Sequence, residues 1–297
     1  MPTIYREPVT TPAAIALDPA AGRGRPIVSI TTDFGARDPS TAICKGVVLT
    51  IAPQVTLIEI TSEIPKFQVR DGALVLWCAL PFLPVGVHVA VVDPGVGTER
   101  LPIALATVRG DVLIGPDNGL LIPAAERLGG IVAAHAIEDP AYRLSAVSTS
   151  FHGRDIFAPA AAHVALGVPV AALGRALEPA ALARLDWPQP RVADGALETA
   201  VVYVDSFGNA KLAGEPADLV AAVGPLTPGD LLLVIVAGAG AARSHEVPWV
   251  ETFGAVVPGA PLLYEDSYGR LCLAANQASV AGLLDLHDGA HLAIRRA

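Results

Sequence analysis

The stretch RPIVSITTDFG, residues 25–35, decides the fold class of this chain. A run of β-branched and apolar residues ends in polar residues and a glycine, which is typical of a buried strand that runs into a loop. Helical spacing follows over residues 40–52, and a second strand pattern covers residues 54–61. Because strand and helix patterns alternate, the sequence predicts an α/β domain with a largely parallel sheet and helices on both faces.

The same alternation continues toward the middle of the chain. The patterns predict helices over residues 69–83 and 119–129 and strands over residues 86–95, 101–108 and 111–119. In sheets of this kind, ligands bind beyond the carboxyl ends of the strands. Asp33 and Asp93 both follow directly after a predicted strand. We therefore expect a binding site where these two strands end.

The pattern changes after Leu185. Residues 186–198 are rich in proline and irregular, as expected of a linker. Short strand patterns separated by turn residues then predict a small β-barrel or sandwich, with strands over residues 197–212, 231–238, 248–254 and 261–276. The expected organisation is a flexible leader over residues 1–26, an α/β domain over 27–188 and a barrel-like domain over 196–297.

Composition narrows the class of protein. Of the 297 residues, 52% are hydrophobic and 16% charged, which is ample for a buried core. The net charge of −9, without any run of Lys or Arg, argues against a nucleic-acid partner. The apolar window over residues 230–242 is too short to span a bilayer. The cysteines Cys44, Cys78 and Cys272 are far apart and form no CxxC pair, which argues against a zinc site or a disulfide framework and favours the reducing cytoplasm.

Two segments place carboxylates at strand ends. In TTDFGARD (31–38), Asp33 and Asp38 accept hydrogen bonds only, which suits the vicinal hydroxyl groups of a ribose; the alternative is a helix N-cap. In VVDPGVGTER (91–100), Asp93 precedes a turn rich in glycine, and Arg100 follows it. Neither phosphate-loop consensus is present. The alternative there is a carboxylate that caps the turn beside a solvated arginine.

A third segment, SFHGRDIF (150–157), places a histidine in front of an Ala-rich helix that could begin at Ile156. Gly153 would let a ligand approach the backbone beside His152, whereas Arg154 and Asp155 could simply pair with each other or cap the helix. A lone histidine is more often structural than catalytic. No HxxxH pair suggests a metal site.

Two later segments, DSFGNA (205–210) and DSYGRL (266–271), each combine an aromatic residue, a glycine and hydrogen-bonding side chains. Phe207 could stack on a purine, and Asn209 could recognise its edge with one donor and one acceptor. Taken singly, each segment is better explained as an ordinary hairpin turn.

Taken together, these segments and PDNGLL (116–121) occur in the order seen in the S-adenosyl-L-methionine (SAM) hydroxide adenosyltransferases, which are related to the SAM-dependent fluorinase and chlorinase. The resemblance extends from Ile27 to the C-terminus. It implies an N-terminal α/β domain, a C-terminal β-barrel domain and a homotrimer that binds SAM at the subunit interfaces. It also implies hydrolysis of SAM to adenosine and L-methionine, without a metal and with SAM as substrate rather than cofactor.

The resemblance further implies roles for individual residues. The catalytic set falls on Asp93, Arg100 and His152: Arg100 would favour hydroxide, while Asp93 and His152 would orient the water in line with ribose C5′ or accept its proton. The implied substrate contacts are Asp33, Phe67, Phe151, Gly153, Asp205, Phe207, Asn209, Phe253, Ser267, Tyr268 and, through its backbone, Ala275.

The sequence departs from the family pattern at three positions, and two other functions compete. Gln68 replaces an Asp or Asn, Tyr268 replaces the Arg of the halogenases, and Cys272 replaces a polar residue. One competing function is that of a halogenase, although the carboxylate of Asp93 would repel a halide. The other is a sensor that binds SAM or adenosine without turnover, against which the intact catalytic set argues.

Overall fold

The computed structural model describes residues 24–237 and 242–297. The chain forms two compact units that divide between Leu185 and Asp186. Residues 1–23 of the expected leader, and the end of the apolar window over residues 230–242, lie outside the described residues. Each unit is described here by itself.

The N-terminal unit is built on one six-stranded sheet with the order β2-β1-β3-β5-β4-β6. Strands β2, β1, β3 and β5 run parallel to one another, whereas β4 runs antiparallel to both β5 and β6. The predicted α/β fold is confirmed, with β4 as the strand that makes the sheet mixed. The strands are β1 (Ile27–Thr32), β2 (Thr56–Thr61), β3 (Val87–Val91), β4 (Pro102–Thr107), β5 (Val112–Pro116) and β6 (Ile131–Ala136).

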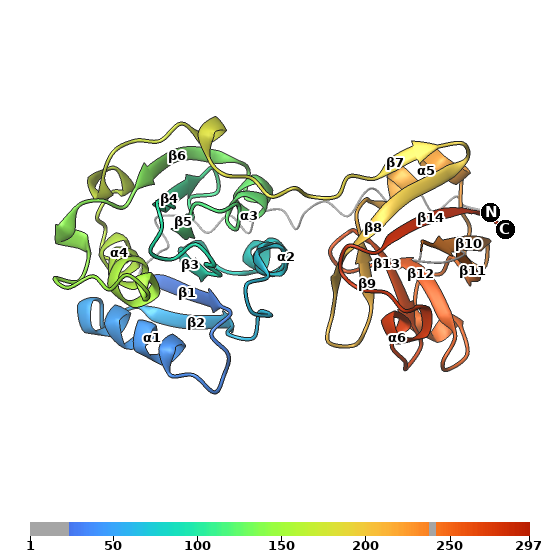
Figure 1. Cartoon of the computed structure of the whole chain (residues 1–297), viewed down its shortest axis with the longest axis horizontal. Coiled ribbons are helices and arrows are strands. Elements are labelled where there is room, and N and C mark those ends of the chain that lie inside the picture. The colour runs from blue at the N-terminus through green and yellow to red at the C-terminus, as the bar shows by residue number, and fades with distance from the viewer. Residues whose placement is uncertain (1–23, 238–241) are drawn as a thin grey trace. The chain divides into compact units, whose positions relative to one another are not determined.

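Helices cover this sheet (Figure 1). Helices α1 and α4 pack on each other, and their apolar side chains join Val28, Ile30 and Val89 of the sheet in one buried core. Helix α2 packs on α3, and its Gly72 lies against Val92, the residue directly after β3. Because Val89 and Val91 belong to the core under α1 and α4, the alternation of side chains puts Val92 on the opposite face of the sheet. The helices are α1 (Ser40–Ile51), α2 (Val69–Ala79), α3 (Ile122–Arg127) and α4 (Ala158–Ala165), with short 3₁₀ turns at Leu80–Phe82, Pro140–Tyr142, Val170–Leu173 and Pro179–Ala181.

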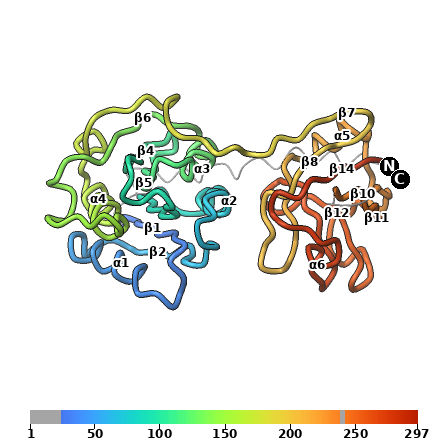
Figure 2. The backbone as a smooth tube through the Cα atoms, in the orientation of Figure 1, coloured from blue at the N-terminus to red at the C-terminus, as the bar shows by residue number. Residues whose placement is uncertain are grey.

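The register of the sheet brings the two predicted strand ends together. Strands β1 and β3 are neighbours, and Thr32 lies opposite Val91. Asp33 follows Thr32 by one residue, and Asp93 follows Val91 by two, so both aspartates lie at the same edge of the sheet. Figure 2 traces the backbone in the orientation of Figure 1, with β1 labelled and β3 in the place that Figure 1 labels. The position expected for a ligand in a parallel sheet is thus occupied by both carboxylates.

The C-terminal unit is an antiparallel, barrel-like sheet with the order β11-β10-β14-β8-β9-β13-β12, in which β7 also pairs with β8. Just past β11, Trp249 bridges to Leu263 of β12, so the two ends of this order meet and the barrel is nearly closed. The strands are β7 (Arg191–Ala193), β8 (Ala196–Val204), β9 (Ala210–Leu212), β10 (Leu231–Val236), β11 (Arg243–Pro248), β12 (Pro261–Glu265), β13 (Leu271–Ala275) and β14 (His291–Arg296), with helices α5 (Pro216–Val223) and α6 (Val280–Leu284).

Two expectations about local structure are wrong. The predicted strand over residues 248–254 is instead the end of β11 followed by a 3₁₀ turn, Phe253–Ala255. Its apolar residues occupy loop positions, while β11 itself has the polar sequence RSHEVP. The helix expected from Ile156 begins at Ala158, because a π-helical turn, Gly153–Phe157, precedes it. Such turns occur frequently at functional sites.

Candidate active site

A pocket of about 330 Å³ lies where β1 and β3 end in the N-terminal unit. It collects residues from all three polar segments of the sequence and from the loop that leads into α2. Its lining consists of Asp33, Phe34, Lys66, Phe67, Val91, Asp93, Val96, Ser150, Phe151, His152 and Gly153. The structure thus brings together six of the seven substrate-site and catalytic residues expected on this unit: Asp33, Phe67, Asp93, Phe151, His152 and Gly153.

Gly97 allows two loops that are distant in the sequence to meet at this pocket. It has a φ of +76°, which a glycine adopts without strain. A Cβ at this position would lie 2.3 Å from the carbonyl oxygen of Thr149, which is far inside van der Waals contact. The turn after Asp93 therefore packs directly on the segment that carries His152, and no other residue type fits at position 97.

Arg100 joins Asp93 and His152 in one hydrogen-bonded array. Its Nε donates to Asp93 Oδ1 over 3.1 Å, and its Nη2 donates to Asp93 Oδ2 in a forked ion pair. The same Nη2 lies 3.1 Å from His152 Nδ1. Both charged side chains are almost completely buried, so solvent screens their interaction little. The array fixes the three side chains relative to one another.

The contact with Arg100 determines which nitrogen of His152 carries the proton. A guanidinium group only donates hydrogen bonds, so Nδ1 must accept, and the proton of the neutral ring lies on Nε2. Burial lowers the pKa of His152 below its ordinary value, and the adjacent Arg100 charge lowers it further. Nε2 has no hydrogen-bond partner within residues 24–237 and 242–297, and His152 lines the pocket. Neutral His152 can therefore donate a hydrogen bond to a molecule in the pocket.

Neighbouring residues hold this array in place. The guanidinium of Arg100 lies 5.4 Å from the ring centre of Phe157, a buried cation–π contact. Its Nη1 is buried and has no partner among the described residues. Asn118, from the segment PDNGLL, donates through Nδ2 to the carbonyl of Val92 over 2.9 Å and so fixes the backbone next to Asp93.

In the segment FHGRD, the two charged residues, Arg154 and Asp155, bind each other. Arg154 donates through Nε to Asp155 Oδ1 over 2.6 Å, and the buried Asp155 also accepts from the backbone of Ser148. The expected pairing of Arg154 with Asp155 is confirmed. Gly153 is closely packed, because a Cβ there would lie 3.3 Å from Phe34 and 3.4 Å from the sulfur of Cys44, and these side chains would have to shift slightly.

Phe151 and the two aspartates of TTDFGARD differ in their surroundings. The ring of Phe151 meets Phe34 edge to face at 5.9 Å, with Arg154 stacked 4.9 Å from its centre. Asp33 is buried at the pocket, and its Oδ2 accepts from the backbone N–H of Phe67 over 2.9 Å. Asp38 is exposed, and hydrogen bonds from the side chain and then the N–H of Ser40 lower the pKa of its carboxyl group. Asp38 lies one residue before Pro39, the N-cap of α1, and does not line the pocket, so neither the ribose role nor the N-cap alternative describes it.

The C-terminal unit holds the remaining expected contacts in two turns of the same construction. Asp205 Oδ1 accepts from the N–H groups of Phe207 and Asn209, and Asp266 Oδ1 accepts from those of Tyr268 and Arg270. Asp205 Oδ2 also accepts from the Asn209 amide over 3.0 Å. The ring of Phe207 is 79% exposed. The hairpin-turn alternative thus describes the backbone of both segments, while the exposed aromatic ring stays available to a ligand.

The residues around the second turn form a partly buried cluster. Lys211 pairs with Asp266 over 2.6 Å, and its ammonium group lies 4.9 Å from the centre of the Tyr268 ring. Phe253, 37% exposed, packs on Tyr264 with ring centres 5.0 Å apart. The remaining expected positions are the exposed Ser267, the buried Ala275 at the end of β13, and the buried Cys272, where burial raises the pKa of the thiol to about 12. Cys272 is therefore a neutral packing residue at neutral pH.

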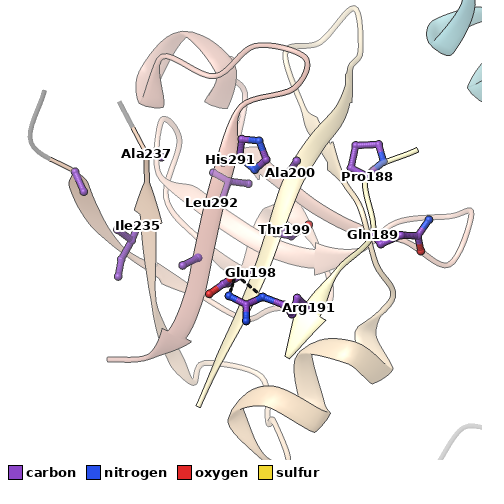
Figure 3. Close-up of a pocket in the computed structure, with 12 residues that line it drawn as sticks. Pro188, Gln189, Arg191, Glu198, Thr199, Ala200, Ile235, Ala237, His291 and Leu292 are labelled. Atoms are coloured by element: carbon purple, nitrogen blue, oxygen red, sulfur yellow. Dashed lines mark hydrogen bonds and ion pairs between the residues drawn. The ribbon is translucent and has the colours of Figure 1, made fainter. Parts of the chain in front are cut away.

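A hollow of about 500 Å³ in the C-terminal unit contains none of the expected site residues. Figure 3 shows its rim, where Arg191 and Glu198 face each other in an ion pair. Its floor includes Ala200 and Ala293, and both rim side chains are largely exposed. The buried Thr199 of its lining already donates through Oγ1 to the carbonyl of Ala213, so this hollow has no chemistry comparable to that of the N-terminal pocket.

Within residues 24–237 and 242–297, no group of three or more His, Cys, Asp or Glu side chains could hold a metal ion. The described part of the chain also has no helix that is both long and apolar enough to cross a membrane.

Sequence reasoning missed several residues of the pocket. Lys66 lies beside the expected Phe67 but belongs to no recognisable pattern. Ser150, Phe34 and Val96 lie within the three polar segments, where nothing in their residue types indicated a ligand. Asn118 acts through a backbone carbonyl, a contact that only the three-dimensional structure reveals.

Comparison with known proteins identifies the family. Residues 28–174 match the SAM hydroxide adenosyltransferase N-terminal domain, and residues 199–293 match the C-terminal domain. An (R)-S-adenosyl-L-methionine hydrolase from Salinispora tropica is 43% identical over 91% of this chain and 97% of its own length. A fluorinase from an Actinoplanes species is 30% identical over 92% of this chain and 99% of its own length. A crystal structure of an uncharacterized conserved protein from Thermotoga maritima superimposes with a TM-score of 0.83 at 31% identity, covering 91% of this chain and all of that one. The chain belongs to the SAM hydroxide adenosyltransferase family.

Proposed function

We propose that this protein hydrolyses SAM to adenosine and L-methionine. The observation that carries the proposal is the array of Asp93, Arg100 and His152, which is buried at the edge of a pocket that also contains Asp33. The (R)-S-adenosyl-L-methionine hydrolase of Salinispora tropica, 43% identical, supports the same reaction.

In the proposed reaction, a water molecule in the pocket attacks C5′ of the ribose opposite the sulfonium. The new bond joins the water oxygen to C5′, while the C5′–S bond breaks and its electron pair stays on sulfur. Methionine leaves as a neutral thioether, so the leaving group needs no proton. The chemical task of the protein is to orient the water and to remove its proton.

The geometry of the array suggests how it does both. The Nε2–H of His152 donates to the water oxygen, because Nδ1 already accepts from Arg100. The carboxylate of Asp93 accepts the proton, since each of its oxygens keeps a lone pair beyond the one used by Arg100. The charge of Arg100 stabilises hydroxide character that develops on the attacking oxygen.

We further propose that substrate contacts are divided between the two units. Asp33 binds the ribose hydroxyl groups, while Phe67 and Phe151 line the sugar. The exposed rings of Phe207 and Phe253 contact adenine, with Asn209 at its edge, and Asp205, Ser267, Tyr268 and the backbone of Ala275 hold the methionine end and the base. In this proposal Gly153 contributes its backbone to the wall of the pocket.

The proposed assembly is a homotrimer with the site at the interface between subunits. Aromatic rings that are exposed on a single chain, such as Phe207, support this, because a neighbouring subunit and a ligand would cover them. We place the protein in the cytoplasm, with no metal, further cofactor, nucleic acid or membrane as a partner. Light scattering tests the trimer, and mixing an Asp93→Ala chain with a Phe253→Ala chain should restore activity if two subunits share one site.

The reaction is tested by incubating the purified protein with SAM, with and without chloride or fluoride, and separating the products by chromatography. We expect equal amounts of adenosine and methionine whether or not a halide is present. A 5′-halogenated adenosine would instead identify a halogenase, which the carboxylate of Asp93 disfavours. Tight binding of SAM without any product would identify a sensor.

A further inference from the structure

Phe67 adopts a strained conformation at the pocket. Its φ of +66° lies in the left-handed region, which a residue with a large side chain rarely occupies. The ring is also 68% exposed, so burial of the ring does not compensate for the strain. Strained residues of this kind persist only where the surrounding structure holds them, and they concentrate at functional sites.

Four hydrogen bonds tie the loop that carries Phe67 to the turn after β1. Two involve the start of the loop: the N–H of Gly35 donates to the carbonyl of Ser62 over 2.7 Å, and the N–H of Ala36 donates to the carboxylate of Glu63. The other two converge on one residue, as Phe67 N–H donates to Asp33 Oδ2 and Lys66 Nζ donates to the Asp33 carbonyl.

The two bonds to Asp33 respond differently to a bound ligand. The carboxylate that holds Phe67 N–H is the group that would also accept the hydroxyl groups of a ribose. The bond from Lys66 uses the main-chain carbonyl, so a ligand on the carboxylate does not compete with it. Lys66 is thus the side chain next to Phe67 that can keep this end of the loop in place when the pocket is filled.

We propose that Lys66 is a positioning residue that clamps the loop to Asp33 and so holds the strained Phe67 ring at the pocket; this rests on the function proposed above. Without the clamp, the backbone of Phe67 relaxes toward an unstrained conformation, and only part of the population presents the ring to the substrate. The apparent affinity falls by that fraction, whereas the water held by Asp93, Arg100 and His152 is not affected.

The kinetic test compares Lys66→Met, which keeps an unbranched side chain of nearly the same length but removes the donor, with Lys66→Arg, which restores one. We expect Lys66→Met to raise KM for SAM by about three- to tenfold and to change kcat by less than about twofold. This is the size expected from the loss of one partly exposed charge-assisted hydrogen bond. Lys66→Arg should recover most of this. Lys45→Met is the matched control, because Lys45 pairs with Glu59 on the surface and does not line the pocket.

A double-mutant cycle shows whether Lys66 acts through Phe67. In a Phe67→Gly background the strain and the ring are both absent, so adding Lys66→Met should change KM by less than about twofold. An unchanged KM in the single Lys66→Met variant would overturn the proposal. So would an equally large effect of Lys66→Met in both backgrounds, which would mean that Lys66 binds the substrate directly.

A readout without SAM separates this inference from the proposed reaction. Amide hydrogen exchange should be faster over residues 64–68 in Lys66→Met than in the unmodified chain or in Lys45→Met, because the N–H of Phe67 loses protection. This holds even if the protein turns over another substrate. Equal exchange in all three proteins would contradict the clamp, whatever the activity.

Discussion

Replacing His152 by Gln and by Asn tests whether the imidazole donates a hydrogen bond or removes a proton. The amide nitrogen of Gln can reach the place of Nε2, whereas Asn can offer an acceptor only near the place of Nδ1, toward Arg100. If the ring acts as a donor, Gln should restore much of the activity and Asn should not. If the ring acts as a base, neither amide can replace it.

The size of the effect follows from the single hydrogen bond at stake. Losing a hydrogen bond to an oxygen that carries developing charge costs about 1.5–3 kcal/mol, which corresponds to a decrease in kcat of about 10- to 150-fold. We expect a decrease of this size for His152→Asn and His152→Ala, and a kcat within about tenfold of the unmodified enzyme for His152→Gln.

The pH dependence gives an independent check. Cationic His152 cannot accept from Arg100 and would add a second positive charge beside it, so only the neutral form supports the array. Since burial and Arg100 lower the pKa of His152 from its ordinary value, kcat should be constant near neutral pH and fall only below about pH 6.5. Both amide variants should lack this acidic decline.

The assay is initial-rate formation of adenosine between pH 5 and 9 at saturating SAM, with circular dichroism to confirm that each variant is folded. If Gln is as slow as Ala while the unmodified enzyme declines in acid, the ring removes the proton and the donor role is wrong. An acidic decline that persists in the Gln variant would belong to another group, such as Asp117, whose carboxyl pKa is raised by burial.

Three further predictions concern other parts of the site. Arg100→Ala should lower kcat by at least about 100-fold and change the SAM affinity measured by calorimetry by less than about threefold. The surface variant Arg175→Ala should change neither quantity. If SAM binding is lost in step with activity, Arg100 instead anchors the substrate. Gly97→Ala should lower the melting temperature by several degrees and reduce kcat, because a Cβ there meets the carbonyl of Thr149 at 2.3 Å. The control, Gly195→Ala, should lower stability only because of its positive φ, since no atom lies near its Cβ. Equal kcat in both variants would contradict the role of Gly97 in joining the two loops. Activity should survive dialysis against a metal chelator, and recovery of lost activity by one added divalent metal would refute the metal-independent mechanism.

Hydrophobic periodicity predicted strands β1 to β5 and helices α1, α2 and α3 of the N-terminal unit, but not β6 or the start of α4. The strands from β1 to β5 are apolar runs, and the chirality of parallel connections limits how they can be ordered. Periodicity was not sufficient for β11, since its sequence RSHEVP has little apolar character and pairs with β10 at one end of the sheet order. There, main-chain pairing rather than burial of side chains determines the strand.

The sequence predicted which residues form the site but not the hydrogen bonds between them. Asp93 and His152 are distinctive because each lies in a polar cluster beside a glycine. The sequence could not show that Arg100 occupies Nδ1 of His152, because this depends on the approach of two loops through Gly97. It also gave no sign of Lys66, whose partner is the main-chain carbonyl of Asp33.

The most direct test of the central claim is the fate of the oxygen atom of water. Turnover of SAM in H₂¹⁸O, followed by mass spectrometry, should give adenosine with one ¹⁸O at the 5′ position and unlabelled methionine in equal amount. This is the result expected if a water held by Asp93, Arg100 and His152 attacks C5′. Unlabelled adenosine, or a 5′-halogenated product in the presence of halide, would contradict the account.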